Sequence, residues 1–379
     1  MKYREKFGFG CMRLPLKDKD DETSINQDLF NEMVDLYMSK GFNYFDTSYA
    51  YHEGKSENAI KKALIERYPR ESFEICDKMP TWALKSYDDN EKFVNIMLER
   101  LGIEYFDVFL IHNINTPWFE LAEKYNTFEY VKEMKEKGLA KKIGFSFHEK
   151  SDLLEKVLNK YGDMIDIVQL ELNYLDWEDL AIESHKCYDL CVKHDLDVYV
   201  MEPLKGGVII NQPKSIKDDF KEFNPNKSIA SFALRFCASL KNVKRVLSGM
   251  NKMDDLLDNI ETYENFEVLN EVEEEFLLKQ AENLRNILEV PCSECEYCSD
   301  SCPADIPISD YFSLYNLSKQ QKDSNMYRLY YDKLVNETVS PEECIECEAC
   351  IDYCTQQINI PKELKKLSQY FKEGFTPYE

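Results

Sequence analysis

The amino-acid sequence predicts an α/β protein, a parallel (β/α)8 barrel of the TIM type followed by a smaller cysteine-rich domain. Two observations carry this prediction. Between residues 8 and 249, amphipathic helical stretches alternate with short apolar segments, and the eight segments are enough strands to close a barrel. After about residue 288 the alternation ends, and eight of the 13 cysteines follow in two short runs. A doubly wound open sheet is the competing fold, but no G-x-G-x-x-G motif opens a helix after the first strand, so we prefer the barrel.

The helices and strands of the predicted barrel follow one recurring pattern. In LFNEMVDLYMSKG, Leu29, Met33 and Tyr37 share one helical face, and Gly41 suits the left-handed residue that often ends a helix. Helical stretches also precede the apolar segments in KKIGFS and DVYVMEP. The eight expected strands lie at residues 7–12, 44–47, 73–78, 107–112, 141–146, 167–172, 198–201 and 244–249.

A domain boundary is expected where this alternation stops. A charged helix ends near residue 285, and Pro291, which cannot continue a helix, precedes the first cysteine run. We therefore assign residues 1–288 to the barrel and residues 289–379 to a second domain. An aromatic-rich helical segment separates the two cysteine runs. No low-complexity linker divides the domains, so we expect them to pack together.

The composition excludes several classes of partner. A net charge of −24 would repel the phosphate backbone, so we expect no nucleic-acid partner. The N-terminus, MKYREKFGFGCMRLP, lacks an apolar signal core, and no apolar run approaches the roughly 18 residues of a membrane span. We therefore expect a cytoplasmic protein without membrane contact, whose cysteines are reduced thiols or metal ligands.

Four polar residues at the ends of predicted strands form a set suited to reducing a carbonyl group. Active sites of such barrels lie at the carboxyl ends of the strands, where this sequence places Asp46, Tyr51, Lys78 and His112. A tyrosine, with a reference pKa of about 10, is a poor acid at neutral pH unless a cation such as Lys78 stabilises its anion. Asp46 would hold that lysine in place, and His112 could donate a hydrogen bond to the substrate oxygen. Taken singly, these residues would also suit a helix cap, a core histidine and a solvated lysine.

These motifs resemble those of the aldo-keto reductase family. The resemblance runs over about residues 3–288 and rests on FGFGCMRLP at the start, the D-x4-Y spacing, the lysine and LERLGIEYFDVFLIH. It implies that Tyr51 is the general acid in an oxidoreductase acting on a carbonyl and alcohol pair, with Asp46, Lys78 and His112 in supporting roles. The alternative is an electron-transfer or sensing protein whose barrel is a non-catalytic nucleotide-binding or docking scaffold.

The resemblance also implies a nicotinamide cofactor. Family members hold it with a serine-asparagine pair after the fifth strand and a glutamine on the sixth; here Ser146 and Gln169 match, whereas Phe147 replaces the asparagine. Many NADPH-preferring members carry a lysine and an arginine after the last strand. The matching positions are Gly249 and Asp255, so we expect NADH to be favoured over NADPH. The expected cofactor-binding residues are Ser146, Gln169, Met201, Pro203, Leu204, Gly206, Ser248, Gly249 and Asn259.

The two cysteine runs, CSECEYCSDSC and CIECEACIDYC, share the spacing C-x2-C-x2-C-x3-C. This spacing resembles that of the bacterial two-cluster ferredoxins, and a ferredoxin-like C-terminal domain with two [4Fe-4S] clusters marks a subgroup of aldo-keto reductases. The resemblance implies a partly helical domain in which the fourth cysteine of each run ligates the cluster of the other run. One cluster would be held by Cys292, Cys295, Cys298 and Cys354, and the other by Cys344, Cys347, Cys350 and Cys302.

Two departures from the ferredoxin pattern accompany these runs. Thr355 stands where a proline usually follows the second run, and 41 residues, 303–343, separate the runs. Zinc is the alternative to iron and sulfide, since C-x2-C pairs also suit tetrahedral zinc sites. Eight cysteines in two runs of identical spacing favour iron–sulfur clusters.

The two predicted kinds of cofactor carry electrons differently. A nicotinamide transfers two electrons together as hydride, whereas each cluster carries one. The clusters could be structural and dock a redox partner such as ferredoxin, or they could deliver electrons to the barrel, directly or through a flavin. We expect the substrate to be a small carbonyl compound or alcohol, with Trp82 and Trp118 as candidates for either its pocket or the core.

Overall fold

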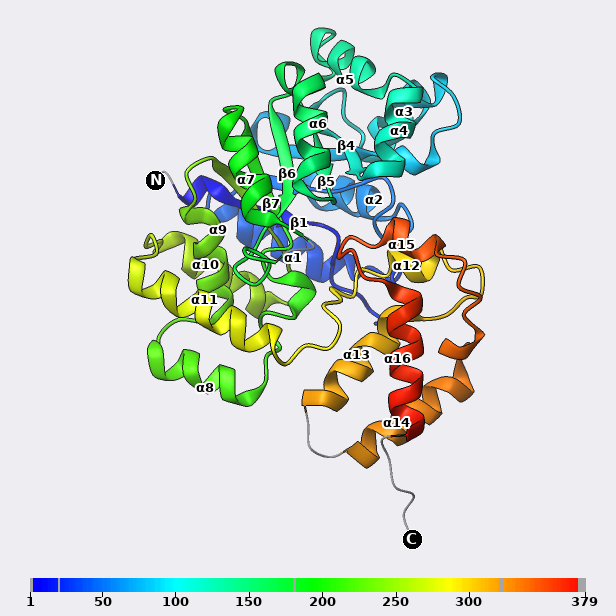
Figure 1. Cartoon of the computed structure of the whole chain (residues 1–379). Helices are drawn as coiled ribbons and strands as arrows, with labels where there is room; N and C mark the ends of the chain where they lie inside the picture. The colour runs from blue at the N-terminus through cyan, green and yellow to red at the C-terminus, as the bar shows by residue number, and fades with distance from the viewer. Residues whose placement is uncertain (1–2, 20, 180–181, 321–323, 374–379) are drawn as a thin grey trace.

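The computed structural model describes residues 3–19, 21–179, 182–320 and 324–373. Eight parallel strands close into a barrel in chain order, β8 pairing with β1 (Figure 1). The predicted (β/α)8 barrel is therefore confirmed, and each strand begins and ends within two residues of its expected bounds. The strands are β1 (Phe7–Gly10), β2 (Tyr44–Asp46), β3 (Glu74–Met79), β4 (Phe106–Ile114), β5 (Ala140–Phe147), β6 (Ile167–Glu171), β7 (Asp197–Met201) and β8 (Val243–Gly249).

Helices connect these strands and cover the outside of the barrel. They are α1 (Gln27–Ser39), α2 (Ser56–Ile60), α3 (Asp88–Leu101), α4 (Thr116–Lys124), α5 (Thr127–Glu136), α6 (Ser151–Tyr161), α7 (Ser184–Lys193), α8 (Lys214–Phe223), α9 (Ile229–Ser239), α10 (Met253–Glu264) and α11 (Glu271–Arg285). Shorter helical turns are η1 (Arg4–Lys6), η2 (Lys61–Ile65), η3 (Arg70–Ser72), η4 (Thr81–Ala83), η5 (Gly162–Met164) and η6 (Lys205–Gly207).

Local sequence signals set the ends of these elements. Asn26 caps α1 by accepting a hydrogen bond from the backbone N–H of Leu29 at 3.3 Å, and Gly41 adopts the expected left-handed conformation with φ of 77°. Along the barrel, Asp46 pairs with Gly10 on one side and with Cys76 on the other. This register brings the carboxyl ends of the strands to one mouth, where their following residues can meet.

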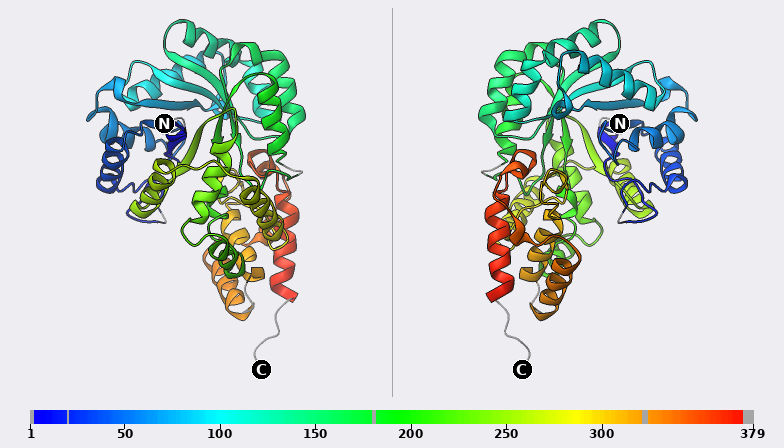
Figure 2. Two further views of the ribbon diagram at one scale, coloured as in Figure 1. Left: turned by 90° about the vertical axis from the view of Figure 1, so that its left-hand side faces the viewer. Right: turned by 90° about the vertical axis from the view of Figure 1, so that its right-hand side faces the viewer.

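The second domain is built from helices and cysteine-bearing loops. No strand occurs among its described residues, so the domain is more helical than expected. The segment between the cysteine runs folds into two helices that pack together, which accounts for the long separation of the runs. Figures 1 and 2 show α13 and α16 side by side, extending away from the barrel, and α12 and α15 beside its mouth. The elements are α12 (Tyr297–Asp300), α13 (Ile308–Gln320), α14 (Ser324–Glu337), η7 (Pro341–Glu343), α15 (Ala349–Tyr353) and α16 (Ile360–Glu373).

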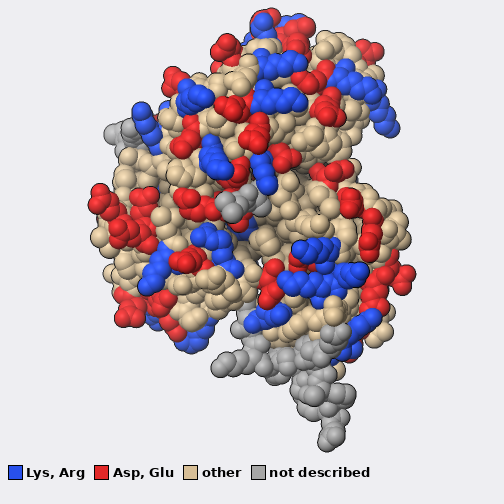
Figure 3. Space-filling model, in the orientation of Figure 1, with Lys and Arg blue, Asp and Glu red and all other residues tan. Residues whose placement is uncertain are grey.

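The buried apolar side chains form separate cores for the two domains. The barrel core ends with Leu284, with the partly buried Leu288 packed against it, whereas a second core begins at Val290 and includes Tyr311 and Phe371. On this ground we propose a domain boundary between residues 288 and 290. None of the helices in the described ranges has the length and hydrophobicity needed to cross a membrane. Figure 3 shows acidic and basic side chains interspersed over both domains on one face.

Candidate active site

The four polar residues predicted from strand ends meet in one buried cluster. Lys78 on β3 donates a hydrogen bond to Asp46 Oδ1 at 2.5 Å and another to the carbonyl oxygen of Thr47 at 2.7 Å. The same ammonium lies 3.4 Å from the Tyr51 hydroxyl. His112 on β4 completes the cluster, with its ring centre 6.0 Å from that of Tyr51. A phenol, its cationic partner and an anchoring carboxylate are thus brought into contact.

Burial and charge set the protonation states of this cluster. Burial raises the pKa of Tyr51 to about 12, and the charge of Lys78 opposes that rise. Burial alone would lower the pKa of Lys78, but the charges of Asp46 and Tyr51 raise it above its usual value. Burial and the charge of Lys78 hold the pKa of His112 well below its usual range. At neutral pH the cluster therefore holds a protonated tyrosine, an ammonium and a neutral imidazole.

Two further side chains orient the cluster. Gln169 on β6, which was expected to bind cofactor, donates a hydrogen bond to Asp46 Oδ2 at 3.0 Å. Ser48 lies 2.9 Å from His112 Nδ1 through its hydroxyl oxygen. The sequence analysis missed Ser48, and its place two residues after Asp46 is the signal that could have found it.

The cysteines of the two runs lie close to one another in the second domain. The first three cysteines of the second run share one apolar cavity with the fourth cysteine of the first run, namely Cys344, Cys347, Cys350 and Cys302. Burial raises the pKa of the Cys298 thiol, and the nearby Cys295, Cys354 and Cys292 raise it further. All eight are free thiols, and within the described ranges no three His, Cys, Asp or Glu side chains converge on a single-ion site. The gathering of the thiols supports the predicted ligand sets.

Comparisons with known proteins match both parts of this architecture. A sequence profile described as the Aldo/keto reductase family matches residues 6–275, more than half of the chain. The chain belongs to the aldo/keto reductase family. A second profile, described as a 4Fe-4S dicluster domain, matches residues 291–358. An aldo/keto reductase barrel extended by a C-terminal 4Fe-4S domain was the predicted architecture, which is confirmed.

Individual relatives of this aldo/keto reductase are distant. An aldo-keto reductase of Mycobacterium avium is 25% identical over 229 residues, which cover 60% of this chain and 73% of the relative. The NADH-specific methylglyoxal reductase of Escherichia coli is 28% identical over 188 residues, which cover 45% of this chain and 54% of the relative. Among solved structures, the holo form of an aldo-keto reductase from Bacillus halodurans has a TM-score of 0.57 at 22% identity, over 73% of this chain and 91% of that one. This structural likeness shows the fold alone.

One cavity of about 290 Å3 lies at the carboxyl ends of β7 and β8 and contains most of the expected cofactor residues. Two of them lie outside its lining. Ser146 accepts a hydrogen bond from the backbone N–H of Asn113 at 2.8 Å, and Asn259 donates one to Ser248 at 2.8 Å. Tyr51 also lines the cavity, which places the cluster beside it. The expected residues in the lining are Gln169, Met201, Pro203, Leu204, Gly206, Ser248 and Gly249.

The charged residues of this cavity differ in part from those expected. Asp255, at the position where many NADPH-preferring family members carry a basic residue, lines the cavity as expected. Two cations that the sequence analysis did not consider, Arg13 and Lys252, line it as well. Arg13 forms an ion pair with Glu202 at 3.2 Å. The cavity therefore carries both signs of charge.

A second cavity, of about 240 Å3, also reaches Tyr51 and is shared by the two domains. Trp82 from the barrel lines it, with its ring centre 5.1 Å from that of His112. Trp118 lies outside the lining and packs on Tyr353 at 5.3 Å. The residues that the second domain contributes are Cys295, Glu296, Tyr297, Asp300, Ser301 and Tyr353. The 4Fe-4S domain of this aldo/keto reductase thus forms one wall beside the tyrosine.

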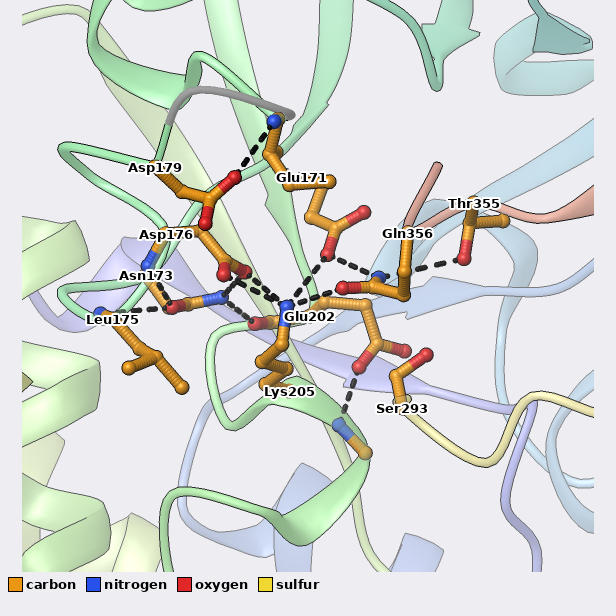
Figure 4. Close-up of polar contacts among 12 residues, drawn as sticks. Glu171, Asn173, Leu175, Asp176, Asp179, Glu202, Lys205, Ser293, Thr355 and Gln356 are labelled. Atoms are coloured by element: carbon orange, nitrogen blue, oxygen red, sulfur yellow. Dashed lines mark hydrogen bonds and ion pairs between the residues drawn. The ribbon is translucent and has the colours of Figure 1, made fainter. Parts of the chain in front are cut away.

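A buried ionic network also joins the barrel to the second domain (Figure 4). Lys205 donates to both carboxylate oxygens of Asp176, at 2.7 and 2.9 Å, and to the side-chain oxygen of Gln356, 151 residues further along the chain. The amide nitrogen of Gln356 donates to Glu171 at 2.5 Å. Burial raises the pKa of Glu171 to about 8, and the charge of Lys205 opposes that rise. Lys205 thus lies 2.7 Å from Asp176 and 3.8 Å from Glu171, and these two carboxyl groups face its charge from within the buried network.

The loop that follows Lys205 fits closely against the second domain. Gly206 has a φ of 61°, and a Cβ at this position would overlap the carbonyl oxygen of Ser293. Arg13 donates to the same carbonyl oxygen at 3.3 Å. Because Gly206 and Arg13 both line the 290 Å3 cavity, the second domain contacts the loop that bounds that cavity. None of these contacts was predicted from the sequence.

Proposed function

We propose that this aldo/keto reductase reduces the carbonyl group of a small molecule, or oxidises the corresponding alcohol, with Tyr51 as the proton donor. The observation that carries the proposal is the buried ammonium of Lys78, 3.4 Å from the Tyr51 hydroxyl and 2.5 Å from Asp46. In reduction, the carbonyl carbon receives a hydride and the oxygen receives the proton of Tyr51. Lys78 stabilises the resulting phenolate. In the tautomer that carries its proton on Nε2, His112 accepts from Ser48 at Nδ1 and can donate a hydrogen bond to the carbonyl oxygen.

A nicotinamide, when bound, would supply the hydride. The 290 Å3 cavity holds the residues that would bind it, and Tyr51 and Asp46 lie in the same lining. We favour NADH because Asp255 would repel a 2′-phosphate, and because one relative is described as NADH-specific. Lys252 is the cation that acts against this preference.

Replacement of Tyr51 by phenylalanine tests the proposal. We expect carbonyl turnover to fall by roughly 100- to 10,000-fold, the usual contribution of a general acid, while the Kd for NADH changes by no more than a few fold. Tyr49→Phe is the matched control, because Tyr49 packs on Phe93 at 5.1 Å and is absent from the linings of both cavities. Equal losses of binding and turnover in Tyr51→Phe would show that the site is misplaced.

We infer that the second domain binds two [4Fe-4S] clusters, which would supply one-electron transfer. The gathering of each run's first three cysteines with the fourth of the other supports this inference. Protein purified without oxygen should contain about eight irons and as much acid-labile sulfide per chain. Stoichiometric zinc without sulfide would contradict it.

A second candidate function is reduction of the same substrate without any nicotinamide. Cys295, an expected cluster ligand, lines the cavity that also contains Tyr51, and this observation favours the candidate. Two one-electron equivalents from reduced ferredoxin or reduced viologen would supply the two electrons, and two protons would complete the alcohol. We expect the protein to form product under anaerobic conditions with reduced viologen as the sole electron donor. Cys298→Ala should abolish this viologen-driven activity but keep any NADH-driven activity. The flavin content is measured on the same preparation. No product with viologen would assign the clusters to a structural or partner-docking role. Nucleotide binding without turnover from either donor would favour the non-catalytic scaffold.

A further inference from the structure

The 240 Å3 cavity next to Tyr51 is lined by acidic residues and by neither lysine nor arginine. Its histidine, His52, accepts a hydrogen bond at Nε2 from the backbone N–H of Leu14, and burial lowers its pKa. The cavity's three carboxylates are Glu22 from the barrel and Glu296 and Asp300 from the second domain. In the described parts of the chain, none of the three forms an ion pair. Burial raises the pKa of the Glu22 carboxyl, and the charge of Asp300 raises it further, which shows that the two carboxylates lie close together. The mouth of the cavity therefore has a negative potential, which Arg13, outside the lining but near Glu296, offsets only in part.

Aromatic rings form much of the remaining lining. Tyr51 and Trp82 come from the barrel, and Tyr297 and Tyr353 come from the second domain. The faces of such rings attract cations, and more strongly where water is excluded. A cluster held by Cys295 and three other thiolates would add further negative charge to the same wall.

One buried polar group in the lining lacks a partner. Asn113 is only 4% exposed, and its side-chain oxygen has no hydrogen-bond partner. The residue also holds a left-handed conformation, with φ of 58°, directly after His112. A buried carboxamide oxygen left without a donor is costly unless a ligand supplies one. The N–H of a primary or secondary ammonium group, or a hydroxyl group, of a bound molecule would do so, whereas a quaternary ammonium group, which has no N–H, would interact with this oxygen only through its charge.

We propose that this cavity selects carbonyl substrates that carry a positive charge close to the reacting carbon, that is, amino or quaternary ammonium aldehydes and ketones and their alcohols. This inference rests on the proposed function, because it assumes that Tyr51 acts on the carbonyl group. Glu22 and Asp300 attract the cation at the mouth, and the rings of Tyr297 and Tyr353 face it inside. Neutral molecules of the same shape bind without this attraction.

A pair of probes that differ only in charge tests the selection. Trimethylammonioacetaldehyde and 3,3-dimethylbutanal have the same shape, since a carbon replaces the charged nitrogen. We expect kcat/KM to be at least about tenfold higher for the charged aldehyde at low salt, with the ratio falling as salt rises. Glu22→Gln and Asp300→Asn should each lower that ratio about two- to fivefold, as expected for partly exposed charges. Glu104→Gln is the control, because Glu104 is an exposed carboxylate just before the amino end of β4, at the opposite end of the strands from the mouth and outside the lining.

Binding measurements separate this inference from the proposed function. The product alcohols, choline and 3,3-dimethylbutan-1-ol, are titrated into the anaerobically purified protein and its Tyr51→Phe variant by calorimetry. Tighter binding of choline in both proteins supports the charge selection even if turnover does not depend on Tyr51. Equal binding of the two alcohols, or a preference that Glu22→Gln and Asp300→Asn leave unchanged, would overturn it. Displacement of choline by millimolar Mg2+ or Ca2+ would also overturn it, in favour of a metal site at the mouth.

Discussion

Replacing Lys205 by methionine is expected to destabilise the whole protein, because it removes the cation of the buried network between the domains. The side chain of Lys205 is 1% exposed and that of Asp176 is 3% exposed, so water cannot compensate for the lost charge. Lys205 is the cation that both Asp176 and Glu171 face, so removal of the ammonium leaves Asp176 as a buried carboxylate without its ion-pair partner. Breaking a buried pair in this way costs about 3–5 kcal/mol. Two hydrogen bonds to the carboxylate and one to Gln356 are lost together, which favours the upper part of that range.

Thermal unfolding measures this cost in the anaerobically purified protein. At about 2–4 °C per kcal/mol for a large unit, the melting temperature should fall by roughly 6–20 °C. All three tryptophans lie in the barrel, so their fluorescence reports the barrel, and cluster absorbance reports the second domain. Both signals should shift. Lys214→Met is the matched control, because Lys214 pairs with Asp218 at 2.5 Å on the surface, with side-chain exposures of 87% and 58%. This variant should shift the unfolding transition by no more than about 1 °C. A change below about 2 °C in Lys205→Met, or a shift in only one signal, would refute the argument.

Three further predictions follow from the two cavities. Asp255→Arg should tighten NADPH binding by at least about tenfold, because it replaces a repulsive charge by a charge-assisted contact. Asp254→Arg, a change outside the cavity lining, should not tighten it. Equal effects of the two variants would contradict the placement of the 2′-phosphate beside Asp255. Alcohol oxidation needs the phenolate of Tyr51, whose pKa is raised to about 12, so its kcat/KM should rise close to tenfold per pH unit between about pH 7 and 9. A plateau within that range would mean that another group is the base. Gly206→Ala should weaken NADH binding, measured as Kd, because the added Cβ displaces the loop from Ser293; unchanged binding would show that the loop has room to move.

The barrel and the meeting of the four polar residues at its mouth were predictable because both depend on short stretches of sequence. Each strand is an apolar segment between a helix and a polar loop, and a parallel barrel brings all the carboxyl ends of its strands to one mouth. Asp46, Lys78 and His112 could therefore be grouped without knowing any contact between them. The 4Fe-4S domain was predictable for a similar reason, since the spacing within each cysteine run is local in the sequence, whereas the cross-ligated sets stay a prediction from the resemblance.

The contacts between the domains could not be predicted in this way. Lys205 and Gln356 are 151 residues apart, and each alone has the pattern of an ordinary surface residue. Their burial results from docking one domain on the other, which no periodicity in the sequence encodes. The places of Arg13 and Lys252 in the lining of the 290 Å3 cavity could not be predicted either, because both residues reach it from loops, whose course no periodicity in the sequence encodes. The docking of the two domains also explains Trp118, a candidate pocket residue that packs on Tyr353 of the second domain instead.

The position of α12 suggests why a reductase barrel carries a cysteine domain. Tyr297 and Asp300 line the 240 Å3 cavity proposed to bind substrate, and the expected ligands Cys295, Cys298 and Cys302 alternate with them along the chain. Ligation of a cluster would fix this short helix, so cluster assembly and completion of the cavity wall would be one folding event. The ion pair of Lys78 with Asp46 lies wholly within the barrel and does not depend on that event. Protein depleted of iron–sulfur clusters should therefore keep the arrangement of Lys78 and Asp46 beside Tyr51 but lose the preference for choline over its neutral analogue. A role of the clusters in electron transfer alone would not cause that loss.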